Sequence, residues 1–314
     1  MVDSKFYRKG LEDLGDGLFA WMQPDGSWGY SNAGLVTDGD QSLLVDTLFD
    51  LPLTESMLVA MRDASPAAHK IDTLVNTHAN GDHTYGNQLV KDAVIIASKS
   101  SALEMTEVTP AVMAEMMRHA DELGETGVYL KRIFGAFDFE SITSTLPTQT
   151  FENEHVHHVG DKEVRLIEVG PAHTRGDVLV HVPGADTIYT GDILFIDGTP
   201  IMWEGPVENY IRACELILEL KPSIIIPGHG PMTDAAGVRG VQDYLIYIRD
   251  EAKIRYDAGL SAQDAARDIA LADFSSWLDS ERIAVNVYTL YREFGSTEPP
   301  PEPLEVFQLM AELA

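Results

Sequence analysis

The sequence has few of the features that extracellular and membrane proteins need. One cysteine, Cys214, is present in 314 residues, which excludes an intrachain disulfide and a zinc site built from several thiolates of one chain. No run approaches the roughly 18 consecutive apolar residues that span a bilayer, and the first fifteen residues lack the apolar core of a signal peptide. We therefore expect a cytoplasmic protein in which histidine and carboxylate side chains hold any metal.

Positive charge is scarce as well. The chain has 22 lysine and arginine residues against 50 aspartate and glutamate residues, a formal net charge of −28. Such a charge repels the phosphates of nucleic acids and the headgroups of anionic lipids. We predict a small-molecule substrate and neither a nucleic acid nor a membrane as partner. The sequence is compatible with a homo-oligomer. With 45% hydrophobic residues, the chain can bury one large core or two ordinary ones.

Strands and helices alternate over residues 15–235, which favours an α/β fold. Turn residues at 23–26 and 38–40 separate three short apolar runs, LFAWM, SNAGLV and QSLLVD, which we predict to be strands. Further apolar strands alternate with helices that we predict over 53–64, from Gln88 onward, and over 207–220.

Two regions depart from this alternation. From about 100 to 140, methionine and alanine residues recur at helical spacing, which predicts a helical insertion. Over 236–314 the apolar residues again recur at helical spacing, and Ser261 with Asp264 forms a candidate capping box. We predict a chemistry-bearing domain over 1–235 and a helical C-terminal region over 236–314 packed on it.

Histidine and aspartate residues follow several of the predicted strands. In α/β sheets the loops after strand ends gather at one rim, so side chains on such loops can converge. Neutral imidazole and carboxylate suit zinc, iron or manganese, and six candidate ligands are enough for two ions. They are His78, Asp82 and His83 after LVNT, His173 after RLIEVGPA, Asp192 after DTIYTG, and His229 after SIIIPG.

These motifs resemble those of the metallo-β-lactamase superfamily of metallohydrolases. His-x-x-x-Asp-His at 78–83 is followed in family order by AHTRGD, TGD and PGHGP. The resemblance implies an αββα sandwich over 1–235, with two metal sites at the edge between its sheets. It implies His78 and His173 in the first site, Asp192 as the bridge, and a second site formed by Asp82, His83 and His229.

One position departs from the family pattern His-x-His-x-Asp-His. Asn80 stands where the second histidine is expected, and an amide oxygen is a weaker donor to zinc than imidazole. We keep Asn80 in the predicted ligand set with three outcomes open: a first site of low affinity, a mononuclear enzyme, or a changed metal preference. The predicted cofactor is one or two zinc ions per chain, with iron or manganese as alternatives.

Six further residues are candidates for contact with substrate. They follow the metal motifs or lie near the hairpin where similar enzymes place a substrate loop. Ordinary packing, or a role in orienting the ligands, explains the same positions. The candidates are Trp28, Tyr30, Asn32, Tyr85, Arg175 and Trp203.

The resemblance implies a metal-dependent hydrolase. A metal-bound hydroxide would attack the carbonyl of an ester, lactone, thioester or amide, and Asp82, the predicted catalytic residue, would orient the hydroxide or relay its proton. Two alternatives stay open. One is an iron-dependent redox enzyme of the same fold, similar to the persulfide dioxygenases, and the other is a non-catalytic binding protein with a weakened metal site.

Overall fold

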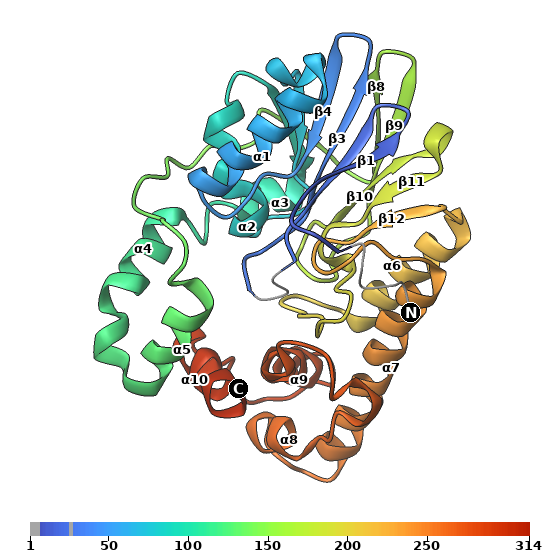
Figure 1. Cartoon of the computed structure of the whole chain (residues 1–314). Helices are drawn as coiled ribbons and strands as arrows, with labels where there is room; N and C mark the ends of the chain where they lie inside the picture. The colour runs from blue at the N-terminus through green and yellow to red at the C-terminus, as the bar shows by residue number, and fades with distance from the viewer. Residues whose placement is uncertain (1–6, 25–27) are drawn as a thin grey trace.

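Two β-sheets form the centre of the computed structural model, which describes residues 7–24 and 28–314 (Figure 1). The first sheet has seven strands in sequence order, and the second has five in the order β12, β11, β10, β9, β8. The first contains β1 (Gly10–Gly15), β2 (Leu18–Met22), β3 (Ala33–Asp38), β4 (Gln41–Val45), β5 (Thr73–Val75), β6 (Val94–Ser98) and β7 (Gln149–Phe151). The second contains β8 (Glu154–Val159), β9 (Lys162–Glu168), β10 (Val178–Val182), β11 (Thr187–Tyr189) and β12 (Ile224–Ile226).

Strand direction brings several strand ends to the same edge. In the first sheet β4, β5 and β6 are parallel. In the second sheet β11 and β12 are parallel, and β9 has the direction of β11 because both pair antiparallel with β10. Side chains that follow β5, β9, β11 and β12 therefore lie at the carboxyl ends of these strands, where ligand-binding sites usually form in such sheets.

The sheets pack against each other through apolar side chains. Leu43 and Val45 of β4 belong to the same buried cluster as Val178 and Val180 of β10. Tyr189 crosses this interface, where its hydroxyl donates to the carbonyl oxygen of Phe19 at 3.0 Å. Because this ring lies against the backbone of β3, a side chain at Gly34 would collide with it.

Helices cover the outer faces of both sheets. On the first sheet, Met57, Leu58 and Met61 of α1 pack on Leu44 and Leu74. The α6 helix packs its apolar side on the outer face of the second sheet, and Figure 1 shows the two helices on opposite flanks. The αββα sandwich is therefore confirmed. The helices are α1 (Leu51–Ala64), α2 (Gly81–Thr84), α3 (Lys99–Glu104), α4 (Pro110–His119), α5 (Gly124–Phe134), α6 (Val207–Leu220), α7 (Ala235–Asp257), α8 (Ala262–Asp268), α9 (Ile283–Glu293) and α10 (Pro303–Leu313).

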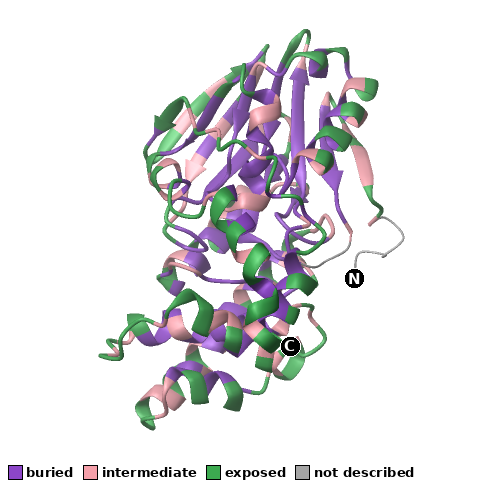
Figure 2. Ribbon diagram, turned by 90° about the vertical axis from the view of Figure 1, so that its left-hand side faces the viewer, coloured by how far each residue is buried: buried purple, intermediate pink, exposed green. Residues whose placement is uncertain are grey.

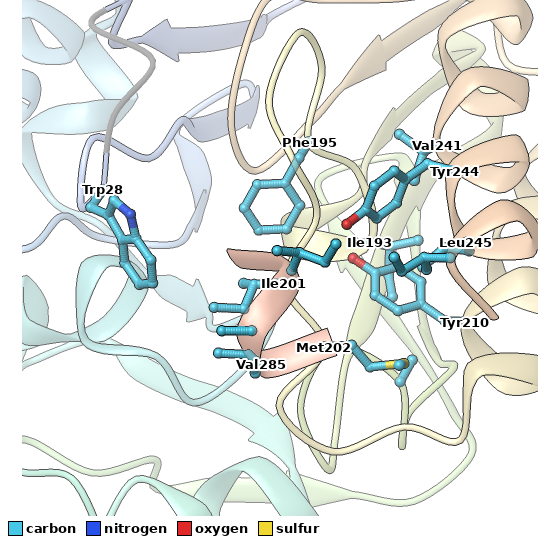
Figure 3. Packing of buried hydrophobic residues seen from close by; sticks show 14 of the residues in the cluster. Trp28, Ile193, Phe195, Ile201, Met202, Tyr210, Val241, Tyr244, Leu245 and Val285 are labelled. Carbon is cyan, nitrogen blue, oxygen red and sulfur yellow. The ribbon is translucent and has the colours of Figure 1, made fainter. Parts of the chain in front are cut away.

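The C-terminal helices share one hydrophobic cluster with the second sheet. Figure 3 shows Tyr244 and Leu245 of α7 beside Tyr210 of α6. On α9, the amide of Asn286 accepts from the backbone N–H of Met202 and donates to the carbonyl oxygen of Pro200, each at 2.8 Å. The helices are buried where they face the rest of the molecule and exposed elsewhere (Figure 2). The C-terminal helices are thus packed on the sandwich.

Local predictions differ from the structure at a few places. The helix expected from Gln88 is wrong, because Tyr85–Val90 forms a 3-10 turn. The insertion is helical only as far as Phe134, and residues 154–159, which we did not predict as a strand, form β8. Ser261 does cap α8, accepting from the N–H of Asp264 at 3.1 Å. Residues 25–27 of the predicted turn lie outside the described residues. In the described part of the chain, no helix is long and apolar enough to cross a membrane.

Candidate metal centre

All six predicted metal ligands meet at the edge formed by the strand ends. His78 follows β5, and Asp82 and His83 lie on α2, the single-turn helix that continues the same segment. His173 follows β9, Asp192 follows β11 and His229 follows β12. Four strand ends therefore supply the donors, and the intervening loops are short.

The carboxylate of Asp192 lies at the centre of this group. The Nε2 atoms of four histidines face its two oxygens, and all five side chains are buried. The distance is 3.0 Å from His83 to Oδ1, and to Oδ2 it is 3.3 Å from His173, 3.4 Å from His229 and 3.6 Å from His78. One carboxylate that faces imidazoles of both predicted sites fits the bridging role that two-metal centres require.

Asp82 is the second carboxylate of the centre. Its Oδ2 lies 3.2 Å from Nε2 of His229 and 3.8 Å from Nε2 of His83. The side chain of Asp82 is 14% exposed, whereas that of Asp192 is 3% exposed. Asp82 is therefore the carboxylate of the centre that can reach solvent.

The donor set fits a metal ion. Two groups of three side chains, His78 with His83 and Asp192, and Asp82 with His83 and His229, place their donor atoms within 4.8 Å of one another. Among the described residues, Nε2 of His78, Nε2 of His83 and Oδ1 of Asp192 are buried atoms without a hydrogen-bond partner. Buried polar atoms are normally partnered, so these converging lone pairs indicate a site for a cation with nitrogen and oxygen ligands.

Asp46 holds two of the ligands in place from behind. Its Oδ2 accepts from Nδ1 of His83 at 2.9 Å, and its two oxygens accept from the N–H and the hydroxyl of Thr77 at 2.7 Å each. The Thr77 hydroxyl oxygen lies 3.0 Å from Nδ1 of His78. A proton fixed on Nδ1 of His83 leaves its Nε2 lone pair for the metal, the usual effect of a carboxylate behind a histidine ligand.

Asn80 faces the first predicted site. Its Nδ2 lies 3.1 Å from Nε2 of His173. Because Nδ1 of His173 donates to the carbonyl oxygen of Ile201 at 2.6 Å, the Nε2 atom carries the lone pair and accepts from the Asn80 amide. A metal at His173 would displace this N–H group, and Asn80 would then have to offer its oxygen.

Burial and opposite charges set the protonation of the centre. Burial raises the pKa of Asp82, but the imidazoles of His83 and His229 outweigh this effect and lower that pKa to about 2. Burial lowers the pKa of His229, whereas the carboxylates of Asp192 and Asp82 raise it to about 8. Burial and the neighbouring His83 lower the pKa of His78 well below its usual range. Burial lowers the pKa of His83, but the carboxylates of Asp192, Asp82 and Asp46 outweigh this effect and raise that pKa well above its usual value. Asp82 is thus ionised and His78 neutral at pH 7, and a bound metal must displace a proton from His229 and from His83.

Replacing Asn80 by histidine is expected to strengthen the first site. An imidazole would stand where an amide now donates to His173, and imidazole is the better zinc donor. Titration with a competing chelator should show a weak ion, or a single ion, in the native chain and a tighter first ion in Asn80→His. Asn80→Ala, which removes the amide without adding a ligand, is the control. Two equally tight ions in the native chain, unchanged in Asn80→His, would contradict this assignment.

Arg282 connects the C-terminal region with the metal centre. Its guanidinium carbon lies 4.5 Å from the ring centre of Trp28 and 5.1 Å from that of Phe195. Phe195 in turn stacks on His229, with ring centres 5.0 Å apart and planes 1° apart. Nη1 donates to the carbonyl oxygen of Thr199 at 2.9 Å, and Nη2 pairs with Asp279 at 3.0 Å. The arginine thus supports the ring on which a metal ligand rests.

Arg282→Lys is expected to lower the free energy of unfolding by about 3 kcal/mol, because the largely buried carboxylate of Asp279 loses the planar guanidinium that pairs with it. The ammonium cannot stack on both rings and reach Thr199 and Asp279 together. Urea denaturation of the metal-free protein measures the loss, with Arg239→Lys, at an exposed position of α7, as the control. Equal stability of Arg282→Lys and the native chain would contradict the role assigned to the stack.

The predicted substrate residues fall into two groups. Trp28 and Trp203 are neighbours, with ring centres 6.5 Å apart. Tyr30 packs on Phe137 of the insertion, with ring centres 5.0 Å apart. The hydroxyl of Tyr85 donates to the carbonyl oxygen of Val108 at 3.1 Å, so the insertion flanks the metal loop. The contact of these four residues with substrate stays a prediction.

The other two candidates have their polar groups engaged by the protein. The amide nitrogen of Asn32 donates to the carbonyl oxygens of Pro227 at 3.0 Å and Gly230 at 2.8 Å, on either side of His229. Arg175 lies on the surface, where its two terminal nitrogens contact the carboxylate of Glu107 at 2.6 and 2.7 Å. Asn32 therefore positions the His229 loop, and substrate contact by either residue stays a prediction.

Sequence reasoning missed several residues that support the ligands. Asp46 could have been found, because it follows the buried strand β4 in the same way that the ligands follow theirs. Ser31 and Tyr210 carry no such signal, although their hydroxyls donate to the backbone oxygens of Asp82 at 2.5 Å and Asp192 at 2.6 Å. Phe195 is likewise found only through its stacking on His229.

Comparison with known proteins agrees with this arrangement. A family model described as the metallo-beta-lactamase superfamily matches residues 26–229. Two relatives, each a beta-lactamase-like protein 2 homolog, are 25% identical over 205 residues in Drosophila melanogaster and 24% identical over 217 residues in Caenorhabditis elegans. These matches cover 64% and 68% of this chain and 58% and 60% of the relatives. The chain thus spans about three fifths of the length of these curated relatives.

Solved structures share the fold at low identity. The stereoselective inverting sec-alkylsulfatase Pisa1 from Pseudomonas sp. has a TM-score of 0.66 at 15% identity, and covers 95% of this chain and 53% of its own. The DIM-1 metallo-beta-lactamase has a TM-score of 0.55 at 20% identity, and covers 76% of this chain and 96% of its own. The alkylsulfatase likeness therefore includes much of the C-terminal region, and the β-lactamase likeness covers a smaller share of this chain.

Proposed function

Because this chain belongs to the metallo-β-lactamase superfamily, we propose that it is a metal-dependent hydrolase of small molecules that contain an ester, lactone, thioester or amide. The observation that carries this proposal is the Asp192 carboxylate, which four imidazoles face at 3.0 to 3.6 Å. Zinc is the proposed cofactor, at one or two ions per chain, since nitrogen and oxygen donors converge there with unpartnered lone pairs.

The chain's own residues have distinct roles in this proposal. His78, His173, Asp192, His83, Asp82 and His229 would hold the metal. When bound, the metal supplies a hydroxide nucleophile at neutral pH and polarises the substrate carbonyl. Asp82 is ionised, with its pKa lowered to about 2, and is partly exposed. It can therefore accept a hydrogen bond from the nucleophile and orient it.

Metal analysis and a substrate screen test the proposal together. The purified full chain is expected to contain one or two zinc ions and to hydrolyse at least one member of a panel of aryl esters, lactones, thioesters and β-lactams. A chelator should abolish the hydrolysis, and zinc should restore it. Bound iron with oxygen-dependent turnover would instead favour the redox alternative. A chain that binds no metal and turns over no substrate would favour the non-catalytic alternative.

Sulfate esters are a second candidate substrate class. The fold likeness to the sec-alkylsulfatase extends over 95% of this chain, whereas the likeness to the β-lactamase covers 76%. This observation concerns the fold and supports testing the class. A secondary alkyl sulfate therefore belongs in the same panel, with sulfate release as the measurement.

A further inference from the structure

A cavity of about 470 Å³ lies between α9, α10 and the segment that joins them. Its volume is within the range of sites for small molecules. Val285 and Tyr288 of α9 and Val306 and Phe307 of α10 line it, together with three consecutive prolines of the joining segment. Trp203 is the wall residue that comes from the catalytic body.

Trp203 places this cavity next to a metal ligand. Its backbone N–H donates to the carbonyl oxygen of His173 at 3.0 Å. From the other side, its carbonyl oxygen lies 3.5 Å from the hydroxyl oxygen of Thr289 on α9. Its ring centre lies 6.5 Å from that of Trp28, which stacks with Arg282 beside the metal centre. One residue therefore joins the cavity wall to the backbone of a predicted metal ligand.

Two polar groups at the wall are engaged by the protein backbone, whereas the buried hydroxyl of Tyr291, also at the wall, has no hydrogen-bond partner among the described residues. A terminal nitrogen of Arg292 donates to the carbonyl oxygen of Glu204 at 2.6 Å, and the hydroxyl of Thr289 donates to the carbonyl oxygen of Met202 at 2.8 Å. Most of the remaining wall is the surface of aliphatic, aromatic and proline side chains. Binding of an alkyl group to such a surface is favourable because it removes apolar area of both from water.

We infer that this cavity binds the linear alkyl or acyl chain of the substrate whose reactive group is at the metal centre. This inference rests on the proposed function. The C-terminal region, which builds most of the wall, is then the part of the chain that selects substrates by the length of their apolar tail.

Chain-length dependence of hydrolysis is the first test. The p-nitrophenyl esters of acetate, butyrate, octanoate and decanoate are compared in the full chain. Four more methylenes removed from water limit the gain from butyrate to octanoate to about 200-fold, and kcat/KM is expected to rise at least about tenfold. Val306→Trp, which fills the cavity from a half-buried position, should abolish this rise and leave kcat/KM for the acetate ester unchanged. Val128→Trp, at an exposed position of α5, should keep the rise.

Binding of octan-1-ol, measured by calorimetry on the metal-free chain, is the second test and does not depend on activity. Binding that is lost in Val306→Trp and kept in Val128→Trp would support the cavity as the tail site. Absent binding, or binding unchanged in Val306→Trp, would overturn it. If octan-1-ol binds there but an active enzyme shows no chain-length dependence, the assignment to the substrate tail is wrong. If no member of the substrate panel is hydrolysed, the proposed function fails while the binding result still decides the cavity.

Discussion

Asp82→Ala is expected to reduce kcat/KM by about 10²-fold or more while the chain stays folded. The carboxylate is both a donor for the second site, 3.2 Å from Nε2 of His229, and the partly exposed group that would orient the nucleophile. Removing a group of this kind costs several kcal/mol of transition-state stabilisation. The fold should survive because Asp82 lies on α2, a helix of four residues outside the sheets.

Three measurements check the Asp82 prediction: turnover of the best substrate in the panel, metal content, and thermal unfolding followed by circular dichroism. Asp92→Ala, at an exposed position just before β6, is the control and should behave like the native chain. If Asp82→Ala keeps most of its activity with normal metal content, the mechanism assigned to Asp82 is wrong.

Asp192→Ala is expected to weaken metal binding more than about 100-fold. Loss of a carboxylate that merely supports a ligand already costs about 10- to 100-fold in affinity, and Asp192 faces the donors of both predicted sites. Without it, the four imidazoles lose the negative charge that attracts a cation into the buried centre. The backbone oxygen that accepts from Tyr210 is unchanged by the substitution, so the local structure should persist.

Competition with a chromophoric chelator measures this loss, and the metal-free forms are compared by urea denaturation. Asp243→Ala, at an exposed position of α7, is the matched control for removal of one carboxylate. Native affinity in Asp192→Ala would mean that Asp192 does not bridge the site. A metal-free variant that does not fold would mean that Asp192 has a structural role in addition to any role in binding.

The convergence of the six predicted ligand side chains was predictable because most of them follow short, largely apolar strands. The strand β5 is buried along its whole length and β12 along most of it, so their sequences stand out, and the first polar residues after them mark the edge of the sheet. The order of the motifs then distinguished His173 and His229 from histidines elsewhere. The alternation of strands and helices predicted an α/β fold, and the resemblance of the motifs to the family implied the sandwich.

Short and polar elements were harder to predict. The strand β8 has the sequence EHVHHV, with mostly exposed or half-buried positions, so burial contributes little to its pattern. After His83, the chain forms a 3-10 turn over Tyr85–Val90 where helical spacing predicted a longer helix. There, the backbone N–H of Gly86 donates to the carbonyl oxygen of Leu48, a tertiary contact that local spacing does not contain.

Local sequence determined most strands, most helices and the six candidate donors of the metal centre, because apolar periodicity and the residue types at strand ends are encoded next to each other in the chain. Only the tertiary structure decided the contacts made across long separations. Asp46 meets His83, Asn80 meets His173, and Arg282 reaches Trp28 and Phe195. The cavity beside Trp203 likewise exists because α9 and α10 pack around a loop that lies far earlier in the sequence. Such contacts depend on how the sheets and helices pack as whole bodies, which no local pattern records.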